Sequence, residues 1–194
     1  MPIIKWNLSC LRKKSRDLVG TLAPLYLREL ITVVQENNGV MIAGVQWGDA
    51  RNFFVSNSLY KSFPPIFYNP TIISLDDPIK EKEGCLSFPG MWITVLSYKY
   101  VTLKYRDSNW KEITASFGAE DRDTEEGLLA KAIIHEVGHL NGETLVDRAT
   151  NEKMKIKHIS KVLQLSMEQN KKFGVPKLIE GPAEIEHVNT NNET

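Results

Sequence analysis

The chain has 194 residues, a length that fits one domain with an ordinary hydrophobic core. Its 24 basic residues balance its 24 acidic ones, so the charge gives no indication of a nucleic-acid partner. No apolar run approaches the ~18 residues of a membrane span, and the start of the chain lacks the apolar stretch of a signal peptide. We expect a cytoplasmic protein with no membrane partner and no sequence-specific nucleic-acid partner.

The first half of the chain predicts one helix followed by several strands. After Pro24, apolar residues recur at helical spacing, and this helix should end at 37–39 with Gly39 in the left-handed conformation. A hairpin turn is predicted at 107–109. Runs rich in β-branched and aromatic residues predict strands at 53–55, 72–75, 94–96, 98–105 and 111–117.

The second half of the chain predicts two helices. One should run from 124 to 141, with Asp123 and Glu126 as a capping box and Gly142 as its stop. The other should run from 152 to 173, where a glycine closes it. A helix, a set of strands and then two helices indicate an α+β fold, because alternating strands and helices would be needed for a parallel sheet.

The segment at 135–139 reads His-Glu-Val-Gly-His and is the most informative string in the chain. Residues four apart share one face of a helix, so the imidazoles of His135 and His139 can reach the same metal ion. Glu136 lies one step round the helix, where it can handle a proton beside the ion without being a ligand. This pattern favours a metal hydrolase.

A catalytic metal site of this kind needs a third protein ligand. Glu143, Asp147 and His158 follow the histidine motif, and Cys85 precedes it within the segment EGCLS at 83–87. A lone cysteine is more often a buried apolar side chain than a ligand. Residue spacing alone does not choose Cys85 over the other candidates.

Three segments together resemble the peptide deformylase family. They are GVMIAGVQ at 39–46, EGCLS at 83–87 and HEVGH at 135–139, in the order of that family. The resemblance implies a metal-dependent hydrolase that removes the formyl group from the formylmethionine of nascent polypeptides. It also implies mixed or antiparallel strands packed around a central metal-binding helix that carries HExxH, plus a C-terminal helix. We expect one catalytic domain at 1–174 and a partly disordered tail at 175–194.

The resemblance also assigns roles to single residues. Cys85 becomes the third metal ligand beside the two histidines, and Glu136 becomes the group that moves the proton. The side-chain amide of Gln46 and the backbone N–H of Leu86 would stabilise the oxyanion of the reaction. The family implies one divalent ion, ferrous iron in the cell, with zinc, nickel or cobalt as substitutes.

Four residues are expected to line the substrate cleft: Gly39, Met41, Gly44 and Ile134. Met41 stands where the family normally has a glycine that lets the substrate backbone approach closely. Trp92 stands in a stretch where the family often carries arginines around the peptide. These departures predict an altered substrate preference.

Other interpretations remain open. A metallopeptidase with the same histidine motif would need neither Cys85 nor Gln46, and a non-catalytic binding module would not need Glu136. A basic stretch near the end of the chain is either a solvated helix face or a docking surface for the ribosome. Its lysines are Lys153, Lys155, Lys157 and Lys161.

Overall fold

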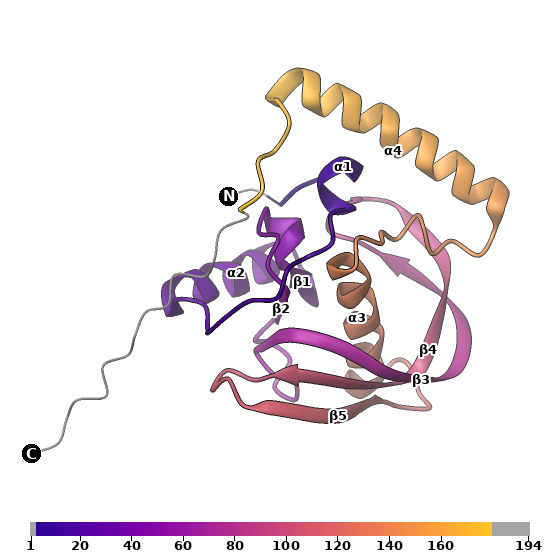
Figure 1. Cartoon of the computed structure of the whole chain (residues 1–194). Coiled ribbons are helices and arrows are strands. Elements are labelled where there is room, and N and C mark those ends of the chain that lie inside the picture. Colours follow the sequence, from indigo (N-terminus) through magenta and orange to yellow (C-terminus); the bar gives the residue numbers. More distant parts are fainter. Residues whose placement is uncertain (1–2, 180–194) are drawn as a thin grey trace, which may run out of the picture.

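The computed structural model describes residues 3–179 and shows one five-stranded sheet covered by helices (Figure 1). The strand order is β1-β2-β3-β4-β5, and each neighbouring pair is antiparallel. The predicted α+β class with an antiparallel sheet is therefore confirmed. The strands are β1 (Met41–Ala43), β2 (Phe53–Ser56), β3 (Ile66–Gly84), β4 (Trp92–Arg106) and β5 (Glu112–Gly118).

The helices take different positions relative to the sheet. They are α1 (Leu8–Leu11), α2 (Pro24–Glu36), α3 (Glu125–Leu140) and α4 (Glu152–Phe173), with a 3-10 turn η1 (Gly44–Trp47) after β1. Helix α3 packs on β1, β4 and β5, and α2 packs on β1 and β2. Helix α4 runs along the outside of the molecule, next to α1 (Figure 1). No helix among residues 3–179 is long and apolar enough to span a membrane.

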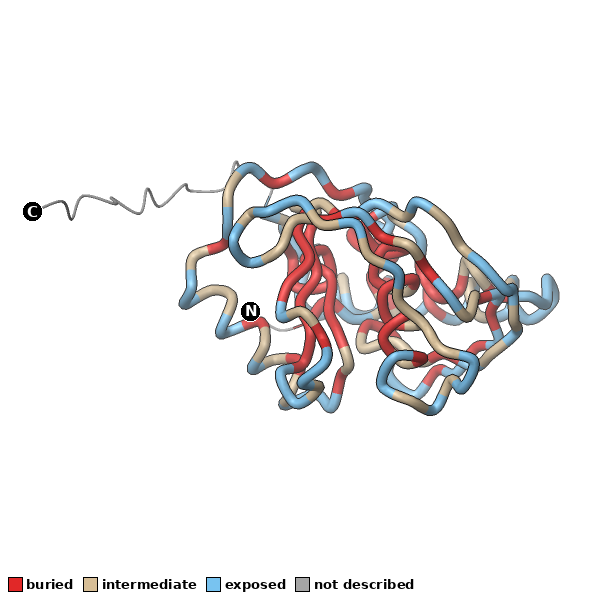
Figure 2. The backbone as a smooth tube through the Cα atoms, turned by 90° about the horizontal axis from the view of Figure 1, so that it is seen from below, coloured by how far each residue is buried: buried red, intermediate tan, exposed pale blue. Residues whose placement is uncertain are grey.

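The main core lies between α3 and the sheet. Ile133 and Val137 of α3 share one cluster with Phe54, Phe67 and Leu103 of the strands. Figure 2 shows that the buried residues gather in the middle of the molecule and the exposed ones on its outer segments. Burial of this kind stabilises by about 25 cal/mol per Å² of apolar surface, so it fixes the position of α3 relative to the strands.

The end of α2 differs from the expectation in one detail. The helix ends at Glu36, just before the predicted 37–39, and Asn38, with φ of 52°, takes the left-handed conformation that was assigned to Gly39. Asparagine tolerates this conformation better than most residues with a side chain. Gly39 serves another purpose, because a Cβ there would lie 2.8 Å from the Cδ1 atom of Leu86. The glycine thus leaves room for the Leu86 side chain.

The boundaries of the two long C-terminal helices match the predictions closely, but the capping residue of α3 does not. The side-chain oxygen of Thr124 accepts a hydrogen bond from the Gly127 N–H at 3.1 Å, so the N-cap is Thr124 and the capping box of Asp123 and Glu126 is wrong. The chain turns after α3 at Gly142, with φ of 80°. A Cβ at Gly142 would lie 2.5 Å from a backbone oxygen, so both conformation and space require glycine.

The strands are longer than the sequence indicates. The predicted runs at 94–96 and 98–105 are one strand, β4, and the run at 72–75 is part of β3. These two strands pair as a long ladder that ends with Gly84 opposite Trp92. Charged residues of this ladder are held in strand conformation by the partner strand, which local composition does not reveal. Since β3 ends at Gly84, the ladder places Cys85 at its end.

The chain after α4 returns to the body of the protein. The N–H of Ile179 donates to the Gly48 carbonyl at 2.6 Å, and the Ala50 N–H donates to the Ile179 carbonyl at 3.1 Å. Ile179, which belongs to the expected tail at 175–194, therefore pairs with the segment that follows η1. Residues 180–194 lie outside the described part of the chain.

Candidate metal centre

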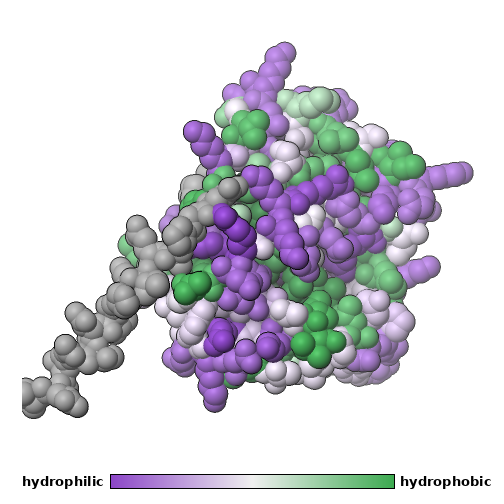
Figure 3. All heavy atoms as spheres, viewed as in Figure 1, coloured by the Kyte–Doolittle hydropathy of each residue, from purple (hydrophilic) through white to green (hydrophobic). Residues whose placement is uncertain are grey.

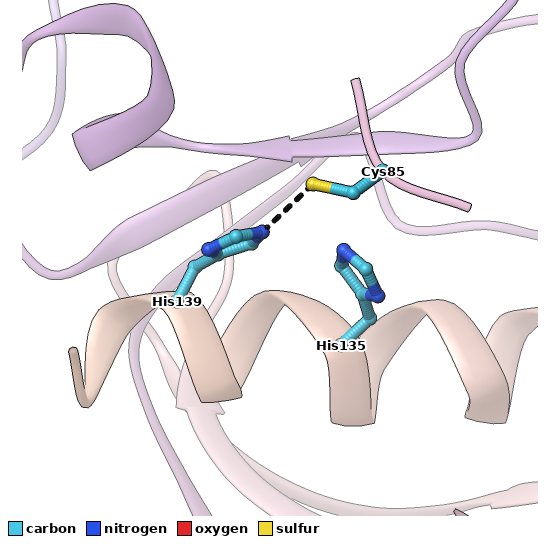
Figure 4. A group of neighbouring side chains, drawn as sticks. All are labelled: Cys85, His135 and His139. Atoms are coloured by element: carbon cyan, nitrogen blue, oxygen red, sulfur yellow. Dashed lines mark hydrogen bonds between the residues drawn. The ribbon is translucent and has the colours of Figure 1, made fainter. Parts of the chain in front are cut away.

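Two distant parts of the chain bring three ligand atoms together. Cys85 follows β3, whereas His135 and His139 lie one turn apart on α3. The Cys85 Sγ lies 3.2 Å from the His139 Nε2, and the three ligand atoms all lie within 4.8 Å of one another. Figure 4 shows the three side chains pointing toward one another. One thiol and two imidazoles form a donor set that suits zinc or iron.

The surroundings of the two imidazoles shift their pKa values in opposite directions. Burial, together with the positive charges of His135 and Arg148, holds the pKa of His139 well below its usual value, so this ring is neutral and has a lone pair to offer. Burial would lower the pKa of His135, but hydrogen bonds to Cys85 and Glu83 outweigh it and raise that pKa well above its usual value. The site therefore favours positive charge beside Cys85, as a divalent ion would supply.

A buried ion pair orients the first histidine. The Oε2 atom of Glu83 lies 2.8 Å from the His135 Nδ1 and 3.1 Å from an Arg148 guanidinium nitrogen. The other Arg148 nitrogen donates to Glu83 Oε1 at 3.2 Å and to the Leu96 carbonyl at 3.1 Å. A carboxylate on one ring nitrogen of an imidazole can fix its tautomer, which would leave the His135 Nε2 free to face an ion.

Glu136 is buried beside the ligands with one oxygen unused. Its side chain is 4% exposed, and its Oε2 atom has no hydrogen-bond partner among the described residues. Burial raises the pKa of Glu136 to about 7, although the nearby charge of His135 opposes this. A carboxyl group in this condition can take up and release a proton close to neutral pH.

The amide of Gln46 is oriented by the turn that carries it. The Ala43 N–H donates to Gln46 Oε1 at 2.9 Å, so the amide nitrogen faces the other way, 3.5 Å from Cys85 Sγ and 3.3 Å from Ser87 Oγ. Tight packing fixes the start of this turn, because a Cβ on Gly44 would lie 2.8 Å from the Phe53 ring. The fold thus directs a neutral N–H donor at the cysteine side of the site.

A cleft of about 530 Å³ lies over these groups. Of the expected substrate residues, Gly39 and Met41 line it, whereas Gly44 and Ile134 are outside its lining. The Met41 side chain is 3% exposed and packs in the main core, so it does not stand across the cleft. Leu86 also contributes to the lining.

The other candidate ligands lie elsewhere. Asp147 accepts hydrogen bonds from Thr144 and Arg12, and His158 is on α4, at the outside of the molecule. Among residues 3–179, Cys85 and the two motif histidines are the group that could hold an ion. The sequence prediction missed the role of Arg148. Arg148 follows the histidine motif in the chain, but nothing in the sequence connects it to Glu83.

The chain is similar to known proteins over most of its length. The sequence model of the family described as polypeptide deformylase matches residues 1–155. A peptide deformylase of Clostridium botulinum is 34% identical over 152 residues, which cover 77% of this chain and 97% of the relative. A peptide deformylase of Chlorobium luteolum is 31% identical, covering 76% of this chain and 77% of the relative.

Solved structures show the same architecture. The crystal structure of peptide deformylase from Thermotoga maritima has a TM-score of 0.67 at 25% identity, covering 77% of this chain and 97% of that chain. The Plasmodium falciparum enzyme shares the fold, with a TM-score of 0.72 at 24% identity over 90% of this chain and 99% of that chain. The family model and the relatives together show that this chain belongs to the peptide deformylase family of enzymes.

Proposed function

We propose that this protein removes the N-formyl group from the formylmethionine of nascent polypeptides and releases formate. The observation that carries the proposal is the convergence of the three ligand atoms with the Gln46 amide and Glu136 beside one cleft. The family and its curated relatives support the same reaction. A protein that acts on nascent chains works where they emerge, so we place it in the cytoplasm.

Cys85, His135 and His139 would hold the divalent ion, which we take to be ferrous iron, with zinc, nickel or cobalt as substitutes. When bound, such an ion supplies Lewis acidity that polarises a carbonyl group and acidifies a water molecule. Glu136 takes a proton from the attacking water at its unpaired Oε2 and passes it to the departing amine. Glu83 and Arg148 keep His135 in the tautomer that ligation needs.

The oxyanion of the tetrahedral intermediate would be stabilised by two N–H donors. One is the Gln46 Nε2, whose direction is set by the bond from Ala43 to the amide oxygen. The other is the backbone N–H of Leu86, which follows the cysteine and lines the cleft. The loss of one such donor typically costs about 3 kcal/mol of transition-state stabilisation.

The proposal is tested by measuring the formate that metal-loaded, anaerobically purified protein releases from formyl-Met-Ala-Ser. Replacement of Glu136 by Gln should lower kcat by about 10²- to 10⁴-fold with the metal retained. A metallopeptidase would instead cut internal peptide bonds and keep its metal after Cys85→Ala. If the protein were a non-catalytic binding module, Glu136→Gln would leave its ligand binding unchanged. Absence of formate from every formylmethionyl peptide would refute the proposed reaction.

We also propose that α4 docks on the ribosome, which would bring the enzyme to its substrate. Lys153, Lys157 and Lys161 are exposed on this helix. Figure 3 shows hydrophilic and hydrophobic side chains interleaved over the part of the surface where α4 lies. Phosphate contacts are strongly salt-dependent, so ribosome co-sedimentation should fall steeply with salt and weaken when these lysines are replaced. Co-sedimentation that is unchanged by added salt and by replacement of the lysines would argue against docking.

A further inference from the structure

The rim of the cleft carries an exposed aromatic ring. Trp92 begins β4 opposite Gly84, lines the cleft and is 69% exposed. Its ring lies over the glycine, because a Cβ on Gly84 would be 3.3 Å from two carbons of the indole. An aromatic residue packed on a cross-strand glycine is a stable arrangement in sheets. The ring is thus held on the strand residue that directly precedes Cys85.

The surroundings of this ring are mainly apolar. Phe88, Pro89 and Met91 line the same cleft as the ring. The nearby cation Lys131 is engaged elsewhere, since its Nζ lies 3.2 Å from Glu81 Oε2 and donates to the Lys82 carbonyl at 3.0 Å. An apolar rim favours apolar side chains of a ligand, which can pack against it.

The position of the ring relative to Cys85 indicates which residues of a bound peptide could meet it. Cys85 is one of the three residues that could hold the ion, and the indole lies over Gly84, the residue directly before Cys85 in the chain. An extended peptide advances roughly 3.3 Å per residue. With its formyl end at the ligand group, a peptide can bring the residues after formylmethionine to the indole.

We infer that Trp92 determines specificity by packing against the side chain of the second or third residue of the substrate. The enzyme then prefers formylmethionyl peptides with an aromatic or large aliphatic residue at that position. The identity of the substrate rests on the proposed function, whereas the apolar contact rests on the geometry of Trp92 alone. Other singly exposed apolar residues are ordinary surface; Trp92 differs because it stands at the mouth of the cleft.

The test uses two peptide series, formyl-Met-X-Ser and formyl-Met-Ser-X, with X as Phe, Leu, Ser or Asp. Affinity is measured by calorimetry on the metal-loaded Glu136→Gln protein, and kcat/KM by formate release from the active enzyme. Both are repeated with Trp92→Ala and Trp92→Phe. The matched control is Leu96→Ala, which removes a 45% exposed side chain from the same face of β4, outside the cleft lining.

Phe should be preferred over Ser by roughly 3- to 10-fold in at least one series, the gain expected from one aromatic contact. Trp92→Ala should abolish this preference, Trp92→Phe should keep part of it, and Leu96→Ala should leave it intact. Equal affinities for Phe and Ser peptides, or a preference that survives Trp92→Ala, overturns the inference. A Trp92-dependent binding preference without formate release from any peptide would refute the proposed function and leave the inference standing.

Discussion

Helices α3 and α4 are both predicted well from their sequences, but they differ in how much of each helix is buried. Most residues of α3 are buried, whereas in α4 only Val162 and Ser166 are. Helix α4 depends on local features, namely its Asn151 cap, whose side chain accepts from the Met154 N–H, and Gly174 at its end. Two of the three candidate ligands, His135 and His139, lie on the helix that tertiary packing fixes. The comparison indicates that tertiary packing fixes the position of a helix more tightly when more of its residues are buried.

The largest expected effect comes from the buried ion pair that joins β3 to α3. Glu83→Ala leaves the Arg148 guanidinium without its carboxylate and should lower the free energy of unfolding by about 3–5 kcal/mol. Urea denaturation of the metal-stripped proteins measures it. The control in α4 is Glu152→Ala, which removes a side chain 78% exposed and should cost less than about 0.5 kcal/mol. Similar losses for both would contradict the contrast between the helices.

The next largest expected difference between the two helices is in the loss of stability when an apolar side chain is truncated. Ile133 of α3 is 0% exposed, so Ile133→Ala should lower the free energy of unfolding by about 2–5 kcal/mol. Leu163 of α4 is 46% exposed, and Leu163→Ala should change it by less than about 1 kcal/mol because little burial is lost. Thermal and urea unfolding report both values. A costly Leu163→Ala would mean that α4 is packed more tightly than its exposure indicates.

A smaller effect, of opposite sign, is expected inside the histidine motif. A Cβ added at Gly138 would meet its nearest atoms, on Arg148 and Glu143, at 3.9 Å, which is ordinary contact. Gly138→Ala should therefore raise the free energy of unfolding by up to about 1 kcal/mol through helix propensity. The melting temperature is the readout, and metal content should not change. A fall in stability would show that the space around Gly138 is needed.

The smallest expected effect is a pH dependence just after α3. Burial raises the pKa of Asp147, but hydrogen bonds from Thr144 and Arg12 outweigh it and lower that pKa in the folded state. Folding therefore favours the ionised form. The stabilisation is present above about pH 4 and is lost as the pH falls through the folded pKa. Urea midpoints of wild type and Asp147→Asn should differ at neutral pH and converge in acid; a constant gap would refute this linkage.

The sequence predicted the helices well because their signals are local. The apolar period, Pro24 and the terminal glycines gave boundaries close to those of α2, α3 and α4. It predicted the strands less well. Strand β1 was missed and β3 was cut short, since a three-residue strand or a charged one is recognisable only with its partner.

In the candidate site, too, local features could be predicted from the sequence, whereas contacts between distant residues could not. The histidine spacing shows directly that two imidazoles share a helix face, whereas Cys85 could be chosen only through the family resemblance. The contacts of Glu83 with Arg148 and of Gln46 with Ser87 join residues far apart in the chain, so no spacing rule could predict them. Trp92 was visible in the sequence as a departure, but its contact with Gly84 needed the ladder register.

The central claim is that the Cys85 sulfur and two imidazoles bind the same ion. X-ray absorption spectroscopy of zinc-loaded protein tests it most directly. One sulfur at about 2.3 Å and two nitrogens at about 2.0–2.1 Å are predicted around one zinc per chain, and Cys85→Ala should remove the sulfur signal. A spectrum without sulfur, or one that Cys85→Ala leaves unchanged, would contradict the account.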